Sequence, residues 1–193
     1  MEFKSLAPGY CSLFASARLT MQVETSAIAR QITAARGRYR SVELKTGVPW
    51  YLTGIIHSLE CGLDFNRHLF NGDSLTARTV NNPAGQPRDG APPFPWEFST
   101  VRALQYDGLD KWTQWDVPGI CYCLEKYNGF GYRAHEIHSP YLWGGSNHYA
   151  SGKFTSDGQF NPDVRTDQIG GAVLLKFLCA ANWVNLKAEK PKS

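Results

Sequence analysis

The sequence lacks the segments that mark several large protein classes. No stretch of the 193-residue chain is apolar over the roughly 20 residues that a transmembrane helix needs. No long block of Lys and Arg marks a nucleic-acid-binding arm. The N-terminal segment MEFKSLAPGYCSLFASARL has no uninterrupted apolar core of a signal peptide, because Pro8 and Gly9 break it. We therefore expect a protein that is made in the cytoplasm, inserts stably into no membrane and binds no nucleic acid.

Metal-binding and nucleophile motifs are also missing. The five cysteines are odd in number, and Cys121 and Cys123 lack a second pair at zinc-ligand spacing, so we expect free thiols. His57 and Glu60 lack the second histidine of a zinc-protease helix, and the histidines of residues 134–148 have no specific metal spacing. No G-x-S-x-G nucleophile elbow and no phosphate-binding glycine loop occurs. The sequence thus predicts neither a metal nor a cofactor.

What the chain does contain is a large apolar fraction with many aromatic rings. It is 42% hydrophobic and 19% charged, which suits one domain with a substantial core. Its six Trp residues fit core packing or a sugar-binding groove, and its formal charge of +3 fits an anionic polymer such as the bacterial cell wall, or no partner. We expect a single catalytic domain over residues 1–186, beginning with an irregular segment over 1–20. Residues 187–193 are expected to form a flexible tail or linker stub.

Apolar residues recur at helical spacing in most of the chain, whereas its middle is rich in turn residues. Leu52, Ile55 and Leu59 form one buried stripe of a helix that Gly62 ends. Residues 66–95 place NGD, NNPAG and RDGAPP turns around the β-prone stretch SLTARTV, which predicts a small β-hairpin lobe. The predicted fold class is α+β, mostly helical with this small lobe. Helices are expected at residues 22–36, 48–62, 96–106, 117–127 and 167–182.

The first candidate site combines Glu60, in the last turn of the helix 48–62, with Asp73 in the turn FNGDS. Glycoside hydrolysis needs a protonated acid and a second, ionised carboxylate. An acid at a buried helix end and another in a polar turn suit these two roles. Asp73 can equally be a turn residue alone, Glu60 can be solvated, and Asp64 is an alternative second carboxylate.

Further candidates could line a groove around these acids. His57 lies on the same helix face as Glu60, where it can hydrogen-bond the acid, line the groove or be a core histidine. The segment EKYNGFGYR follows an apolar helix, so Tyr127 and Asn128 can reach a bound sugar or form a helix C-cap.

Together these stretches resemble the lysozyme superfamily. HSLECGLDF is similar to the acid-bearing helix end that usually reads Glu-Ser in goose-type lysozymes and lytic transglycosylases, although Cys61 stands in place of the serine. EKYNGFGYR is similar to the Tyr-Asn-x-Gly motif of the same enzymes, whereas the Gly-Leu-Met-Gln motif of transglycosylases is absent. The blocks IIHSLECGLDFNRHLFNGDSL, YNGFGYR and SPYLWGGSNHY, within residues 45–180, look like a group of phage and bacterial "lysozyme family" proteins that includes endolysins.

This resemblance implies a lysozyme-like fold and a muramidase that cleaves peptidoglycan between N-acetylmuramic acid and N-acetylglucosamine. It implies that Glu60 is the general acid and that Asp73 and Thr76 help to place the attacking water. The expected substrate-binding residues are His57, Tyr127, Asn128, Tyr132, Trp143 and His148. We expect a monomeric phage or prophage endolysin whose partner is peptidoglycan, acting in the periplasm or outside the cell. A chitinase-like hydrolase, a lytic transglycosylase and a non-catalytic glycan-binding module remain alternatives.

Overall fold

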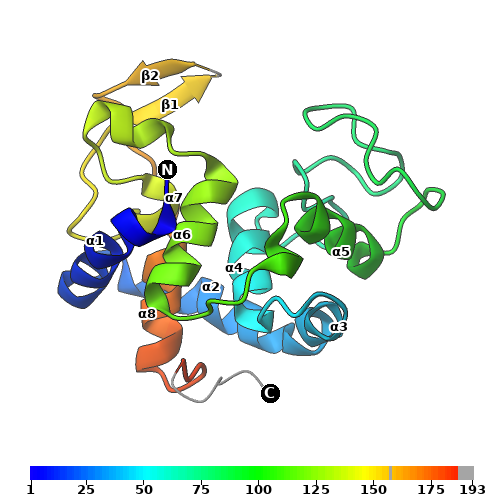
Figure 1. Ribbon diagram of the computed structural model, residues 1–193, viewed down its shortest axis with the longest axis horizontal. Coiled ribbons are helices and arrows are strands. Elements are labelled where there is room, and N and C mark those ends of the chain that lie inside the picture. The colour runs from blue at the N-terminus through cyan, green and yellow to red at the C-terminus, as the bar shows by residue number, and fades with distance from the viewer. Residues whose placement is uncertain (157, 187–193) are drawn as a thin grey trace. The chain divides into compact units, whose positions relative to one another are not determined.

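The computed structural model describes residues 1–156 and 158–186 (Figure 1). Contacts divide the described chain into two compact units, one formed by residues 1–29 with the described residues from 114 to 186 and the other by residues 30–113. Helix α2 (Gln22–Ala34) contributes residues to both units. The tail predicted over residues 187–193 lies outside the described residues. Among the described residues, no helix is both long and apolar enough to cross a membrane.

The first unit is built around helix α6. Helix α1 packs along α6, and α7 and α8 pack against α6 and against each other (Figure 1). The core side chains Ile120 and Leu124 of α6 and Leu174 and Leu175 of α8 are fully buried. The elements of this unit besides the first part of α2 are α1 (Phe3–Ser16), α6 (Val117–Asn128), η2 (Gly131–His135), α7 (Pro140–Trp143), β1 (Lys153–Ser156), β2 (Gln159–Asn161) and α8 (Gly171–Ala180).

Helix α6 begins where its sequence predicts, at residue 117, and ends one residue later than expected, at residue 128. Asp116 is its N-cap, and the carboxylate accepts a hydrogen bond of 3.0 Å from the backbone N–H of Gly119. Pro118 occupies the first turn, where a missing N–H costs nothing. Lys126 lies in the last turn, where its charge suits the carbonyl end of the helix.

Residues 1–20 were expected to be irregular, and this expectation is wrong, because residues 3–16 form helix α1. Pro8 lies inside the helix and removes one backbone hydrogen bond, which is why the isolated sequence looks irregular. Packing along α6 compensates for this loss. Tyr10, two residues beyond the proline, is only 1% exposed.

A mostly helical α+β fold with one small antiparallel sheet is confirmed, but the sheet lies elsewhere than predicted. Strands β1 and β2 pair in the first unit with Phe154 opposite Phe160. Within residues 66–95 the only β contact is an isolated bridge between Arg67 and Ser74. The β-prone stretch 74–80 forms no strand, and its N–H groups bond instead to scattered loop carbonyls and to side chains. For example, the N–H of Val80 donates to the Asp73 carboxylate over 2.8 Å.

The second unit surrounds the buried helix α4, on which α3 packs. Ser58 and Glu60 are the two residues of α4 that are half-buried, and all its other residues are buried. A Cβ placed on Gly54 would lie 2.5 Å from Ile32 Cγ2, so the glycine allows close packing here. The elements of this unit besides the last part of α2 are α3 (Arg36–Thr46), α4 (Trp50–Cys61), α5 (Trp96–Tyr106) and η1 (Leu109–Lys111).

Candidate active site

Glu60 lies in the last turn of α4, in the second unit. Its neighbours Leu59 and Cys61 are buried, while Glu60 itself is half-buried. Gly62 ends the helix in the left-handed conformation, with φ of 58°, and its N–H bonds to the carbonyl of His57. The predicted helix end is therefore confirmed, and the backbone that carries Glu60 is held by the core of this unit.

The loop after α4 folds back onto the end of the helix. The thiol of Cys61 donates to the carbonyl oxygen of His68 over 3.3 Å. A Cβ placed on Gly72 would lie 3.4 Å from the carbonyl oxygen of Glu60, so the backbone of the turn 71–73 passes beside that of Glu60. The turn that carries Asp73 thus meets the helix end that carries Glu60.

The carboxylate of Asp73 holds this loop together. Its Oδ2 accepts from the backbone N–H groups of Val80 and Asn81 and from the Asn71 amide, over 2.8, 3.0 and 3.0 Å. Its Oδ1 accepts from the Asn81 amide over 2.7 Å. These donors, the backbone N–H of Asn81 foremost, hold the pKa of Asp73 below its usual range. Asp73 is therefore an ionised group with a structural task in the turn, whatever else it does.

Thr76 and Asp64, the other polar candidates of this loop, are engaged in local hydrogen bonds. Thr76 is exposed, and its hydroxyl lies 2.9 Å from the hydroxyl of Ser74. Asp64, the alternative second carboxylate, accepts from the Asn66 backbone and side chain and pairs with Arg67 over 3.0 Å. The Asn66 backbone N–H, followed by its side chain, lowers the pKa of Asp64. Asp64 thus has a local capping role of the same kind as that of Asp73.

His57 was predicted to bind substrate, and the structure contradicts this, since the residue is 0% exposed. Its Nε2 donates to the carbonyl oxygen of Asp64 over 3.1 Å, so Nδ1 accepts from the hydroxyl of Tyr39 over 3.0 Å. Burial lowers the pKa of His57 to about 4. His57 is a neutral core histidine that fastens the loop after α4 to the helix.

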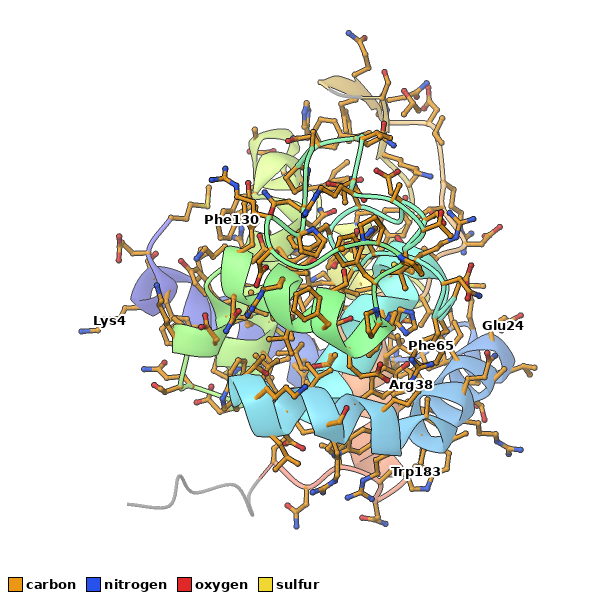
Figure 2. All side chains as sticks on the ribbon, turned by 90° about the vertical axis from the view of Figure 1, so that its right-hand side faces the viewer. Lys4, Glu24, Arg38, Phe65, Phe130 and Trp183 are labelled. Carbon is orange, nitrogen blue, oxygen red and sulfur yellow. The ribbon has the colours of Figure 1, made fainter. Side chains whose placement is uncertain are left out.

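Aromatic packing of Phe65 also holds the loop after α4 against the core. Phe65 contacts the ring of His57, with centroids 4.6 Å apart, and the ring of Trp96 at 4.8 Å. The guanidinium of Arg38 covers Phe65 at 4.0 Å from its centroid and pairs with Glu97 over 2.6 Å (Figure 2). The stretch GLDF that comes after Glu60 and Cys61 is therefore bound to the core by its last residue.

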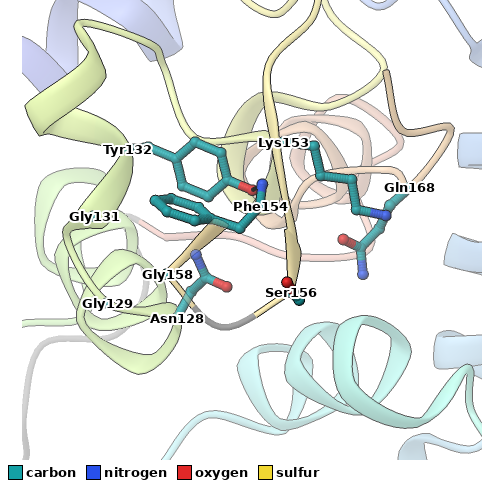
Figure 3. A pocket seen from close by; sticks show the side chains of 9 residues that line it. All are labelled: Asn128, Gly129, Gly131, Tyr132, Lys153, Phe154, Ser156, Gly158 and Gln168. Atoms are coloured by element: carbon teal, nitrogen blue, oxygen red, sulfur yellow. Dashed lines mark hydrogen bonds between the residues drawn. The ribbon is translucent and has the colours of Figure 1, made fainter. Parts of the chain in front are cut away.

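The remaining predicted residues belong to the first unit. Tyr127 and Asn128 end α6, with Tyr127 half-buried and Asn128 exposed. Asn128 and Tyr132 border a cavity of about 530 Å³, and Tyr132 packs edge-on against Phe154 in its wall (Figure 3). The other side chains that reach this cavity are Lys153, Ser156 and Gln168. Aromatic faces beside amides, a hydroxyl and an amine can hold a polar ligand such as a sugar.

Trp143 and His148 are part of the packing around α1. Trp143 is 2% exposed, and its ring contacts that of His148 at 5.6 Å. His148 Nε2 lies 3.0 Å from the carbonyl oxygen of Leu13 and 3.2 Å from the hydroxyl of Ser16. The prediction that Trp143 lines an open groove is wrong, because its side chain is buried.

One buried polar cluster was missed at the sequence level. In the first unit, the side chain of Glu125 of α6 is only 5% exposed. It accepts hydrogen bonds from Tyr10 and from Arg133. The available signal was a glutamate inside the apolar run ICYCLEKY. Among the described residues, no group of three or more His, Cys, Asp or Glu side chains could hold a metal ion.

No protein-family model, curated protein or solved structure matches the chain. The resemblance to the lysozyme superfamily therefore rests on the three sequence blocks, and the roles of Glu60, Asp73 and Thr76 stay predictions. The structure adds one observation: the helix end that carries Glu60 and the turn that carries Asp73 lie side by side within the second unit.

Proposed function

We propose that the protein is a muramidase, a glycoside hydrolase of peptidoglycan in which Glu60 is the general acid. The observation that carries this proposal is the meeting of two segments at one end of α4. Glu60 sits half-buried on a helix that the core holds in place, and the turn bearing Asp73 lies so close that a Cβ added to Gly72 would be within van der Waals range of the Glu60 carbonyl oxygen. A fixed acid near a tethered, ionised carboxylate is the pairing that glycosidic cleavage uses.

In the proposed reaction the protonated Glu60 carboxyl donates its proton to the glycosidic oxygen as the bond breaks. Positive charge then develops at the anomeric carbon, and the ionised Asp73 stabilises it and orients a water molecule. The hydrogen bonds that lower the pKa of Asp73 also weaken it as a base, so its proposed part is to orient the water. The proton that the water releases passes to bulk solvent, and solvent returns a proton to Glu60 after the cleavage. The exposed hydroxyl of Thr76 supplies a second contact to that water, whose attack would invert the anomeric centre.

The proposed substrate is the glycan strand between N-acetylmuramic acid and N-acetylglucosamine. The net charge of +3 favours association with an anionic wall. In the first unit, the cavity beside Asn128 and Tyr132 is the proposed sugar contact. We propose a monomer that acts in the periplasm or outside the cell, as a phage or prophage endolysin does.

The substitution Glu60→Gln tests the acid directly, because it keeps the shape of the side chain and removes the proton donor. The rate at which purified peptidoglycan releases new ends should fall by about 10²–10⁴-fold. The control Glu24→Gln changes an exposed glutamate of α2 and should keep the parent rate. Mass spectrometry of the products distinguishes a muramidase, which gives reducing ends, from a lytic transglycosylase, which gives anhydro ends. Digestion at the parent rate by Glu60→Gln would refute the proposal.

A second candidate function is glycan binding without cleavage. It is favoured by the four hydrogen bonds in which the Asp73 carboxylate is already engaged. A protein that sediments with peptidoglycan but releases no new ends would support this function. Release of reducing ends by the parent protein would exclude it.

A further inference from the structure

A second, smaller cavity of about 210 Å³ lies within the first unit. It is bordered by α1, the end of α6, η2 and residues 137–143. Its polar or aromatic lining comes from Tyr10, Glu125, Arg133, His138, Ser139 and Trp143. None of these six belongs to the proposed acid site, so a ligand held by them would bind independently of Glu60.

Glu125 and Arg133 form an ion pair at this cavity, in which Glu125 is buried and Arg133 is half-buried. One carboxylate oxygen, Oε2, accepts both from Arg133 Nη2 over 2.6 Å and from the hydroxyl of Tyr10 over 2.5 Å. The other oxygen, Oε1, accepts no hydrogen bond from any residue that the structure describes. A carboxylate has room for about four hydrogen bonds, so Glu125 retains capacity for a further donor.

Two residues that line the cavity each carry a buried polar atom with no hydrogen-bond partner among the described residues, namely Arg133 Nε and Ser139 Oγ. Ser139 is only 2% exposed. Leaving a buried polar group unpaired typically costs about 1–3 kcal/mol, and folded proteins rarely tolerate it. Two such atoms beside one cavity point to an occupant that supplies a hydrogen-bond acceptor.

The charges around the cavity cancel. Glu125 and Arg133 carry opposite charges, burial chiefly raises the pKa of Tyr10 above its ordinary value, and burial chiefly lowers that of His138. Tyr10 and His138 are therefore neutral near pH 7, and a ligand without net charge fits best. The cavity exceeds the roughly 150 Å³ that holds a benzene molecule in an engineered apolar cavity.

We propose that this cavity binds a small α-amino acid. The ammonium group would donate to Glu125 Oε1, and the carboxylate would accept from Arg133 Nε and Ser139 Oγ. A zwitterion of this kind is small and has no net charge. It would satisfy the open acceptor, Glu125 Oε1, and both unpartnered donors, Arg133 Nε and Ser139 Oγ.

Titration of the ¹⁵N-labelled parent protein with glycine, L-alanine and D-alanine tests this proposal. The Arg133 Nε–H resonance and the Ser139 amide should shift and saturate in the millimolar range. Acetamide, which offers the same donor and acceptor without charge, should bind more weakly. Equal binding of acetamide would overturn the assignment of a zwitterion, and no shift with any amino acid would overturn the site.

Two variants and a control place the binding in this cavity. Ser139→Ala should weaken binding roughly 2- to 10-fold through the loss of one hydrogen bond. Gly9 borders the cavity, and a Cβ on it would meet no atom within 4 Å, so Gly9→Leu should fill the space and abolish binding. Ser151→Ala, outside the cavity lining, should bind as the parent does. Unchanged binding in Gly9→Leu, or a crystal structure soaked with alanine that shows buried water only, would overturn the proposal.

Discussion

At the scale of single residues, burial separates the structural groups from the candidate catalytic ones. His57 and Glu60 lie three positions apart on one helix, yet His57 is fully buried and Glu60 is half-buried. Asp73 combines both characters, since its carboxylate is partly open and also organises the turn. Substitutions at these positions therefore have to be read for stability as well as for activity.

The buried His57 should make the stability of the protein depend on pH. Its pKa is lowered from 6.5 to about 4 in the folded state, so the unfolded chain binds the extra proton between these values. Above about pH 6.5 His57 is neutral in both states and costs no stability. As the pH falls toward 4, the free energy of unfolding should decrease by about 3 kcal/mol in all. Urea unfolding at both ends of this range should show a smaller loss in His57→Gln than in the parent.

The control for this measurement is His135→Gln, which changes an exposed histidine. It should lose as much unfolding free energy on acidification as the parent does. If His57→Gln and the parent lose equal amounts, His57 does not titrate in this way.

Asp73→Asn should loosen the loop 71–81 before it affects the rest of its unit. The change removes the charge that accepts from the N–H groups of Val80 and Asn81. Hydrogen bonds to charged groups are worth about 1.5–3 kcal/mol, so these two amides should exchange roughly 10- to 100-fold faster. Amide exchange measured by NMR checks this, with Asp64→Asn as the control that leaves both amides unchanged. Equal protection of Val80 and Asn81 in Asp73→Asn would contradict the assigned hydrogen bonds.

At the scale of elements, α4 is the helix on which the candidate acid site depends. It is buried on nearly all sides, and its close approach to α2 relies on the missing side chain of Gly54. A helix so enclosed has little freedom to turn, which fixes the direction in which its last residues leave the core.

Two glycine-to-alanine substitutions in helices should therefore have opposite effects. Gly54→Ala brings a methyl group to 2.5 Å from Ile32 Cγ2 and should destabilise the fold by roughly 1–3 kcal/mol. In Gly9→Ala the added methyl group meets no atom within 4 Å. The change should stabilise the fold by roughly 0.5–1 kcal/mol, because alanine lowers the conformational entropy of the unfolded chain. Thermal unfolding of both variants measures the difference. Equal melting temperatures would show that α4 adjusts freely to the added methyl group.

At the scale of the whole molecule, no disulfide joins the cysteines. All five are free, and Cys61, Cys121 and Cys123 are buried. Burial raises the pKa of Cys61 and of Cys123 to about 12 and that of Cys121 further above its usual range. These three thiols should be inert, since the thiolate is the reactive form.

The protein should therefore be indifferent to reductant. Its melting temperature, and any peptidoglycan cleavage that it shows, should be the same with and without dithiothreitol. Thiol labelling of the native protein should be fast at the exposed Cys11 and slow at Cys61, Cys121 and Cys123. A drop in melting temperature on reduction would mean that a disulfide forms in solution.

The sequence by itself determined those features that depend on neighbouring residues. Asp116 and Pro118 start α6, and Gly62 ends α4, because caps act through backbone groups only a few positions away. The α+β class and most helices could be predicted from apolar spacing. The pairing of Glu60 with Asp73 is a hypothesis drawn from their places at a helix end and in a turn, and the structure shows only that the turn 71–73 lies beside the end of α4.

Only the tertiary structure decided the features that depend on distant partners. Packing on α6 makes a helix of residues 3–16 in spite of Pro8. The hairpin of β1 and β2 packs Phe154 and Phe160 against the ring of Tyr132, which lies more than 20 positions earlier in the chain. His57 is a core residue since Tyr39 and the Asp64 carbonyl meet it there. Glu125 can be buried because Arg133 balances its charge and Tyr10 donates a hydrogen bond to it. Burial and long-range hydrogen bonds are sums over residues far apart in the chain, so local patterns could not predict them.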